Sequence, residues 1–546
     1  MVPSLFMMQR CLFPGAIGCK PSFILVKRYN CSSQKNARLQ DDRWIPTVGL
    51  EIHAQINSQS KLFSSAKNQF MAPPNSLVSN FDASIPGTLP VINKECVRKA
   101  VRTGLALNCK IQKTSFFDRK HYFYSDMPQG YQITQYKHPI AKNGYLHYPT
   151  ADGSVVKRVK IEQIQLEQDS GKSMHEEGQV TLIDLNRAGV GLMEIVTAPE
   201  VSSAGDACAF LKELYGILMR IGTCDGKLAE GQFRVDANIS IAQQKTKLGT
   251  RVEVKNISGF KHIHNVIEYE IKRQIRIVEE GGIVESETRA FDYETGFTVS
   301  MRDKEIKQDY RFMPEPNLPP LHVYDDSSVT SLSNPSSVIN VDQERRNLPK
   351  LPADIRGHLI ESFHLSFVEA EFLTNRNMEN YFIEVMECAH NLNPTVVWNW
   401  IKMHVIAHMV EYNLSSIEEC YVSARDLAAL LLLLHNNEIN AETAHLTFTT
   451  AIQTRQHPDK IVEENNWKMI SDKETVTKLC EDAIATLQCT DAKALSGYDA
   501  DKPKSKASKQ AIKRVIMLVR KNTNDKIHTG VAKDVTMKLL NYKRTS

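Results

Sequence analysis

The eleven cysteines of this chain stand singly, and no two of them form a Cys-x-x-Cys pair. This spacing argues against a zinc ribbon and against a disulfide framework, and it suits a reducing compartment. Long apolar runs are also missing. The longest lies within residues 427–434 and is far shorter than the ~18 to 20 residues that cross a bilayer. We therefore expect no membrane insertion.

The common nucleotide-binding motifs are absent as well. Gly171, Lys172 and Ser173 match the end of a P-loop, but Leu166 occupies the position of its first glycine. The run Gly189-Val190-Gly191 lacks the third glycine of a dinucleotide fingerprint. No Ser/His/Asp or Cys/His arrangement follows from the spacing. Any ATP site must therefore be of another kind.

Excess charge is small, at +4 over 546 residues, so a nucleic-acid footprint must come from local clustering. Such a cluster lies at the end of the chain. Residues 501–546 hold 13 Lys and Arg against 3 Asp, interleaved with the apolar residues Ile512, Val515, Ile516 and Val519. This basic helical face indicates contact with a phosphate backbone. A solvated helix face is the alternative.

The first forty residues contain six basic residues and no acid. This composition is typical of a mitochondrial transit peptide. A secretory signal is the alternative, but Pro14, Gly15 and Gly18 interrupt its apolar stretches. We expect residues 1–40 to be a transit peptide and the protein to act in the mitochondrial matrix.

Four later segments alternate apolar and polar residues with a period of two, as half-buried strands do. They are TVGLEIHAQI, IQLEQD, FRVDANISI and TRVEVKNI. Their polar sides offer many short or stiff side chains of the kind that suits a hard cation and a phosphate-bearing ligand. These residues are Glu51, His53, Gln165, Glu167, Asp169, Arg234, Asp236, Asn238, Glu253 and Lys255. For each strand alone, a solvated sheet face is the plainer alternative.

The passage DLNRAGVGLMEIV sets Glu194 among apolar residues. As a strand, it places Glu194 on one side and Met193 and Ile195 on the other. A carboxylate in apolar surroundings costs several kcal/mol unless a cation pairs with it. That cation is a basic side chain such as Arg187 or a bound metal. Alternatively, the carboxylate reaches water at the strand end.

Two helices are predicted between the strands. Residues 204–221 follow a Ser203 cap, with Asp206 at the capping-box spacing. Residues 262–280 should end at Gly281. The side chains that this second helix should turn inward are Val266, Tyr269, Ile271, Ile275 and Val278. Residues 41–325 thus read as one α+β domain, an antiparallel sheet with packing helices and an open polar face.

The remainder is helical. A Pro-rich stretch precedes a linker at 326–341, a helical domain follows at 342–456, and a basic helical tail domain spans 457–546. His404 and His408 lie one helical turn apart and could bind a metal, but this spacing is more typical of surface residues.

At VGLEIHAQI, KHYFYSDMPQGYQITQ, DLNRAGVGLMEIV, VDANISI, VEVKNISGF and DYRFMPEPNLPPL, the sequence resembles the mitochondrial members of the GatB family, the B subunits of glutamyl-tRNA(Gln) amidotransferases. The resemblance covers nearly the whole chain after residue 40. It implies a catalytic cradle domain at 41–325 and a YqeY-like tRNA-binding tail at 457–546.

The resemblance also implies a ligase reaction. ATP and Mg²⁺ are used to phosphorylate the γ-carboxylate of Glu-tRNA(Gln), and ammonia then displaces the phosphate to give Gln-tRNA(Gln). A GatA-type amidase subunit supplies the ammonia from glutamine, and a GatC-type small subunit completes a heterotrimer. A carboxylate needs this activation because it is a poor acyl donor.

Roles are carried over only at positions that match the family motifs. The implied metal ligands are Glu51, His53, Glu167 and Glu194. The implied catalytic residues are Lys120, Tyr122, Asp236 and Glu253. The residues expected to meet ATP or substrate are Arg187, Arg234, Lys255 and Asn256.

The chain departs from the family pattern at two places. QLEQD stands where relatives commonly have HLEED, so Gln165 and Gln168 leave the ligand set at this strand open. Residues 79–84 contain no cysteine where many bacterial relatives bind structural zinc, so no zinc is expected.

Two other functions remain as alternatives. A non-catalytic scaffold that docks tRNA would need only the basic tail, whereas the acidic and histidine side chains on the strand faces favour an enzyme. An ATP-dependent amide ligase acting on a free metabolite would not need the tail.

Overall fold

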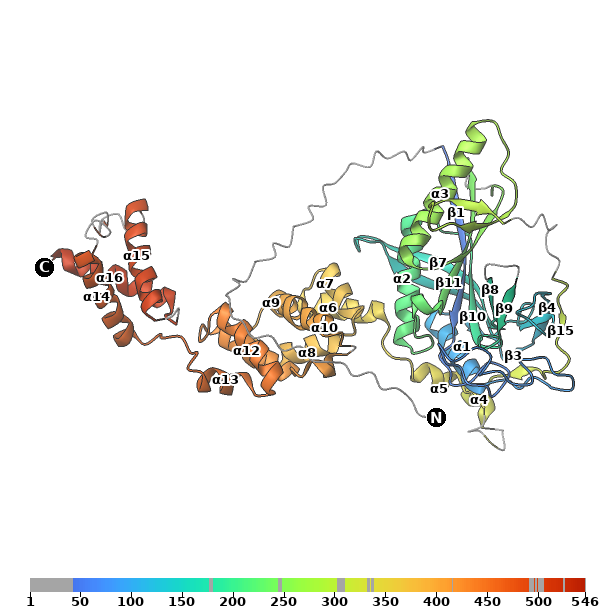
Figure 1. The fold of residues 1–546 in the computed structure, drawn as a ribbon, viewed down its shortest axis with the longest axis horizontal. Coiled ribbons are helices and arrows are strands. Elements are labelled where there is room, and N and C mark those ends of the chain that lie inside the picture. The colour runs from blue at the N-terminus through green and yellow to red at the C-terminus, as the bar shows by residue number, and fades with distance from the viewer. Residues whose placement is uncertain are drawn as a thin grey trace, which may run out of the picture.

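The computed structural model describes residues 43–175, 180–243, 248–301, 310–330, 334, 338–414, 416–490, 495, 498, 505–523 and 526–545. The predicted transit peptide lies outside these residues. Figure 1 shows a sheet domain followed by two groups of helices, which confirms the expected α+β class. No helix of the described part of the chain is long and apolar enough to cross a membrane.

The strands are β1 (Ile45–Gln55), β2 (Lys110–Ile111), β3 (Thr114–Ser115), β4 (Asp118–His121), β5 (Tyr131–Thr134), β6 (Ala141–Pro149), β7 (Val156–Gln168), β8 (Lys172–His175), β9 (Thr181–Asp184), β10 (Gly191–Thr197), β11 (Phe233–Ala242), β12 (Val252–Ile257), β13 (Thr288–Phe291), β14 (Thr298–Ser300), β15 (Met313–Pro314) and β16 (Leu321–His322). Nine of them form one sheet in the order β14-β13-β12-β11-β1-β10-β7-β6-β2. Every neighbouring pair in it is antiparallel except β12 and β13.

The helices of the sheet domain are α1 (Lys94–Ala106), α2 (Ala204–Arg220), η1 (Leu228–Glu230), α3 (Phe260–Glu279), α4 (Asp326–Val329) and α5 (Val341–Arg346). The later helices are α6 (Pro352–Phe363), α7 (Phe367–Thr374), α8 (Glu379–Cys388), α9 (Pro394–Trp400), η3 (Ile401–Val405), α10 (Ile406–Glu411), η4 (Ile417–Cys420), α11 (Ala424–His435), α12 (Ala441–Thr454), α13 (Pro458–Glu464), α14 (Lys473–Thr490), α15 (Lys506–Asn522) and α16 (Thr529–Thr545).

The strand β1 confirms the alternation that its sequence predicts. Val48, Leu50, Ile52, Ala54 and Ile56 are at most 1% exposed and belong to the first hydrophobic core. The helices α2 and α3 pack on this core, α3 against β11 and α2 against β6 (Figure 1). With the apolar side of the sheet covered by helices, the alternating polar side chains are directed to the other side.

The helix α2 begins where predicted, because the Ser203 hydroxyl accepts a hydrogen bond from the backbone N–H of Asp206. The expected inward face of α3 is partly wrong. Tyr269, Ile271, Ile275 and Val278 are only half-buried, while Ile263, Val266, Ile267, Glu270 and Gln274 are buried. The buried face therefore contains two polar side chains that an apolar pattern could not reveal.

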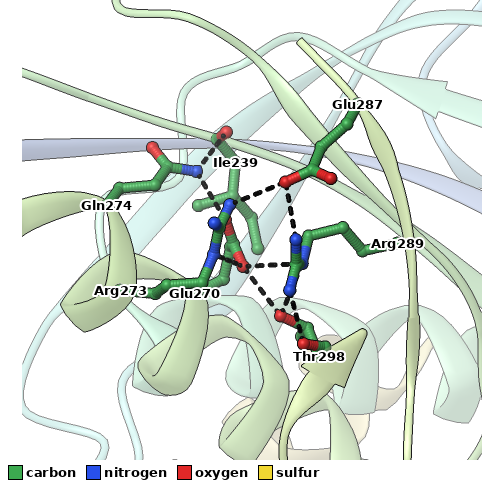
Figure 2. Close-up of polar contacts among 7 residues, drawn as sticks. All are labelled: Ile239, Glu270, Arg273, Gln274, Glu287, Arg289 and Thr298. Carbon is green, nitrogen blue, oxygen red and sulfur yellow. Dashed lines mark hydrogen bonds and ion pairs between the residues drawn. The ribbon is translucent and has the colours of Figure 1, made fainter. Parts of the chain in front are cut away.

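Glu270 lies at the centre of a buried polar network that joins α3 to β13 and β14 (Figure 2). Its carboxylate accepts hydrogen bonds from Arg273 at 2.8 Å, from the Gln274 amide at 3.0 Å and from the Thr298 hydroxyl at 3.0 Å. Arg289 on β13 completes the network through Thr298 and Glu287. Full pairing is what makes a buried carboxylate tolerable.

Three hydrophobic cores divide the chain. The first also receives Val323 and Ile339, with Leu351 packed against it. The second is formed by residues from Ile355 to Val462, and the third by residues from Val476 to Leu540. Packing thus places α5 with the sheet domain and α13 with the helical domain. The expected boundaries at 341 and 457, which rest on composition, lie on the other side of these helices.

Two ion pairs join the first two units. Arg356 on α6 donates to both oxygens of Glu213 on α2 at 2.9 Å, and both side chains are buried. Arg220 at the end of α2 lies 2.5 Å from Glu379 on α8. Gly153, at the turn between β6 and β7, has φ +72° and lies so close to the Phe367 ring that a Cβ would clash. These contacts couple the helical domain to the sheet domain.

We predict that Glu270→Ala lowers the free energy of unfolding of the sheet domain by about 3 to 5 kcal/mol, because it leaves the largely buried Arg273 and Arg289 with one carboxylate fewer. Urea denaturation of the full chain measures this. The control is Glu268→Ala on the same helix, where the pair with Lys272 is exposed and contributes at most about 1 kcal/mol. Equal effects of the two substitutions would contradict a stabilising role for the network.

Candidate functional site

Four adjacent strands, in the order β11, β1, β10 and β7, align the predicted site residues across the sheet. His53 on β1 lies opposite Arg234 on β11 and Glu194 on β10, and Glu194 lies opposite Gln165 on β7. Two residues earlier on β1, Glu51 lies opposite Asp236. The register therefore converts four separate alternating patterns into neighbouring rows of polar side chains.

The first group consists of His53, Glu167 and Glu194, whose possible ligand atoms all lie within 4.8 Å of one another. Burial raises the pKa of Glu167 and of Glu194 above the usual range of a glutamate, while Lys120 opposes the shift in both. Burial lowers the pKa of His53, so the imidazole is neutral and keeps a free lone pair. One oxygen of Glu167, Oε2, is buried without a hydrogen-bond partner.

The second group consists of Glu51, Asp236 and Glu253, again with ligand atoms within 4.8 Å of one another. The Asn238 amide donates to Glu51 at 3.0 Å, and the Thr288 hydroxyl donates to Glu253 at 3.1 Å. Burial, together with the charges of Glu194, Glu253 and Asp236, raises the pKa of Glu51 to about 7.

The two groups do not coincide with the set of metal ligands and the set of catalytic residues that the family resemblance implies. Glu51 lies with Asp236 and Glu253, rather than with the other three implied metal ligands. Residues two apart on a strand share a face but are separated by about 7 Å, so Glu51 and His53 point into different groups.

Two lysines neutralise part of this negative charge. The Lys120 ammonium lies 3.9 Å from Glu167, and Glu167 and Glu194 raise its pKa although burial acts in the opposite direction. The Lys255 ammonium lies 3.4 Å from Glu253. Burial lowers the pKa of Lys255, but Glu253, Tyr310 and Asp236 together raise it above its usual range. Both side chains are therefore cations beside the carboxylates.

The two arginines are arranged around Asp169. Arg234 donates to its carboxylate at 2.9 Å, and Arg187 lies 3.6 Å from the same oxygen. Arg187 also donates to the backbone carbonyls of Ser170 and Gly171. The cation whose charge acts on Glu194 is therefore Lys120, whereas Arg187, which the sequence suggested, binds Asp169 and the loop after β7.

Tyr122 and Asn256 lie at the margin. The Tyr122 ring packs on Tyr124 with centroids 4.4 Å apart, and burial together with Asp126 raises the pKa of Tyr122 to about 12, so the phenol is neutral. The Asn256 side chain is exposed. Its backbone has φ +57°, and its N–H donates to Asp236 at 2.8 Å. Asn256 therefore acts on the second group through its backbone.

The structure separates the two glutamines of QLEQD. Gln165 is buried on the site side and donates to Glu194 at 2.5 Å. Gln168 points to the opposite side, where it accepts from the backbone N–H of Ile133 and contacts the Met127 sulfur. Gln168 is thus outside both groups, as strand alternation alone would indicate.

Sequence reasoning did not assign roles to Thr288, Asn238 and Asp169. Asn238 and Asp169 were on the polar sides of the predicted strands, so their signal was present. Thr288 lies on β13, which pairs with β12 in parallel. No local sequence pattern predicts its contact with Glu253.

The histidines of the helical domain do not form a metal site with other ligands among the described residues. Among the residues that the structure describes, groups of three or more possible metal ligands occur only on the sheet, and there are two of them. His404 instead packs on Trp400 and His445, and His408 packs on Tyr412.

Comparison of the sequence with known proteins identifies the family of this chain. Residues 46–328 match the model of the GatB/GatE catalytic domain, and residues 380–540 match that of the GatB domain. The B subunit of the mitochondrial glutamyl-tRNA(Gln) amidotransferase of Homo sapiens is 44% identical over 93% of this chain and 90% of its own length.

Two further relatives agree. The corresponding mitochondrial protein of Danio rerio is 47% identical over 82% of each chain. The B subunit of the aspartyl/glutamyl-tRNA(Asn/Gln) amidotransferase of Rickettsia rickettsii is 40% identical over 85% of this chain and 92% of its own length. With a catalytic-domain match over residues 46–328 and relatives of this identity and coverage, the chain belongs to the GatB family.

Proposed function

We propose that this protein is the B subunit of a mitochondrial glutamyl-tRNA(Gln) amidotransferase. It would use ATP and Mg²⁺ to phosphorylate the γ-carboxylate of Glu-tRNA(Gln) and would direct ammonia onto the acyl phosphate to form Gln-tRNA(Gln). The observation that carries the proposal is the pair of acidic groups on one sheet face, flanked by Lys120 and Lys255.

The residues present fit divalent cations. Five of the six members of the two groups are carboxylates and the sixth is a neutral histidine, which suits Mg²⁺ or Mn²⁺. Oε2 of Glu167 accepts no hydrogen bond and has the Lys120 ammonium 3.9 Å away, which supports a ligand role, because a buried oxygen without a hydrogen bond is costly. His53, Glu167 and Glu194 would hold one cation, and Glu51, Asp236 and Glu253 a second.

Bound Mg²⁺ would supply electrostatic stabilisation of the transferred phosphoryl group. The chain's own cations would serve the anionic substrate. Lys120 and Lys255 keep their charge beside the carboxylates of the two groups, so they can hold phosphate oxygens as the acyl phosphate forms. The neutral Tyr122 phenol is available as a hydrogen-bond donor at the margin of the site.

The remaining parts of the proposal concern partners. The human and rickettsial relatives are each named as the B subunit of their enzyme, which supports a complex of several chains. We propose that a GatA-type amidase supplies ammonia from glutamine and that a GatC-type small subunit completes a heterotrimer in the matrix. Glu-tRNA(Gln) would contact the basic surface of the tail, where Lys506, Lys509 and Lys513 on α15 are exposed.

Glu194 supplies one of the two carboxylates of the first group. Glu194→Gln keeps the shape of the side chain but removes a carboxylate ligand, so ATP-dependent amidation of Glu-tRNA(Gln) by the reconstituted complex should fall by at least about 100-fold. Binding of tRNA should be unchanged. Glu162→Gln on β7, whose carboxylate pairs with Lys160 at the surface, is the control.

Full activity in Glu194→Gln would place the chemistry elsewhere. The scaffold alternative would then be favoured, since it requires tRNA binding without a catalytic sheet face.

Cation binding at the second group should depend on pH. With the pKa of Glu51 raised to about 7 in the metal-free protein, a cation must displace its proton below pH 7. Affinity of the second group for Mn²⁺ should therefore fall by about fivefold between pH 7 and pH 6, in proportion to the ionised fraction of Glu51. Calorimetric titration measures this change. Glu51→Gln should weaken binding and flatten its dependence on pH, and an unchanged profile in that variant would assign the titration to another group.

Binding of tRNA should depend on the tail. Replacing Lys506, Lys509 and Lys513 together by alanine should weaken tRNA binding and reduce the salt dependence of log K by about one unit for each phosphate that the tail no longer neutralises. Filter binding at several salt concentrations measures both quantities. Lys350→Ala, at an exposed position just before α6, is the control. A wild-type salt dependence in the triple variant would remove α15 from the tRNA interface.

A further inference from the structure

Gln165 forms the closest polar contact to the first metal-ligand group. It is buried on β7 directly opposite Glu194 on β10, with its amide nitrogen 2.5 Å from Glu194 Oε2. The same nitrogen lies 3.3 Å from the Thr134 hydroxyl. An amide at this position holds one carboxylate oxygen of Glu194 and leaves the other for a cation.

The orientation of the Gln165 amide is stabilised by a second glutamine. Gln163, two residues earlier on the same strand, donates its amide N–H to Gln165 Oε1 at 2.7 Å. A carboxylate only accepts hydrogen bonds, so the donor end of the Gln165 amide faces Glu194, and the Gln163 N–H on Oε1 stabilises this orientation. Gln163, Gln165 and Glu194 thus form a directed chain of hydrogen bonds that ends on the carboxylate.

A glutamine here also restricts the kind of metal. The amide nitrogen of a glutamine is a donor and not a metal ligand, so His53 is the single nitrogen ligand within the first group. Imidazole nitrogen favours Co²⁺, Ni²⁺ and Zn²⁺, whereas carboxylate oxygen favours Mg²⁺ and Mn²⁺. An oxygen-rich shell with one histidine therefore biases the site toward the latter pair.

We propose that Gln165, oriented by Gln163, is a positioning and metal-selectivity residue: it fixes the Glu194 carboxylate for an oxygen-preferring divalent cation and keeps a second nitrogen ligand out of the shell. This inference deepens the proposed function, on which it rests for the presence of a cation at this group.

The test is metal binding by the full chain, purified with its partner subunits and without ATP or tRNA. Gln165→Leu should raise the dissociation constant for Mn²⁺ by about 10-fold or more, the range found when an outer-shell partner of a metal ligand is removed. Gln163→Leu should raise it by about 2-fold to 10-fold, because one neutral hydrogen bond that orients Gln165 is removed. Gln112→Leu, an amide replacement outside the site, is the control.

Gln165→His tests selectivity. The imidazole can enter the shell as a second nitrogen ligand, so the ratio of the Co²⁺ affinity to the Mn²⁺ affinity should rise by about 10-fold or more. The visible absorption of bound Co²⁺ should change as nitrogen replaces oxygen. A residue needed only for packing would not move either quantity in this direction.

An unchanged Mn²⁺ affinity in folded Gln165→Leu would overturn the positioning role, and an unchanged metal ratio in Gln165→His would overturn the selectivity role. If Gln165→Leu does not fold, Gln165→Asn decides, because its shorter amide withdraws the donor from Glu194 and should weaken Mn²⁺ binding similarly. Mg²⁺-dependent amidation by the wild type is measured separately. Its absence would contradict the proposed function, whereas normal amidation with unchanged metal binding in the Gln165 variants would contradict only the role of Gln165.

Discussion

The cost of burying carboxylates on one sheet face is the constraint on which the rest of this structure depends. Five glutamate and aspartate side chains and one histidine gather in two groups, and like charges at this separation repel unless cations or protons intervene. Lys120 and Lys255 supply part of the compensation from the protein itself. The negative charge that these lysines leave uncompensated makes the site suited to bind a cation.

Hydrogen bonds from neighbouring residues hold carboxylates of both groups in place. Asn238, Thr288 and the backbone N–H of Asn256 each donate to one carboxylate of the second group, and Gln165 donates to Glu194 in the first. The strand that carries Thr288 is anchored in turn by the network around Glu270, through Arg289 (Figure 2). Support for the second group therefore comes partly from the network beneath α3.

Ion pairs also connect the sheet domain to the helical domain. The buried pair of Arg356 and Glu213, and the pair of Arg220 and Glu379, connect α2 to the helical domain. The third core, which carries the exposed lysines of α15, follows that domain along the chain (Figure 1). In the proposed function, one tRNA molecule would contact the exposed lysines of the tail and place its reactive end at the two acidic groups.

The sequence by itself determined the α+β class, the inward faces of the central strands and the polar residues that oppose them, because strand alternation is a local property read every two residues. It also determined the helix cap at Ser203 and, through its motifs, the family. It did not determine which carboxylates share a group, since the register between strands distant in the chain sets that, nor that Arg187 pairs with Asp169. Tertiary structure decided these points, together with the buried Glu270 and the contact of Thr288 with Glu253, because each depends on partners that approach only when the sheet is assembled.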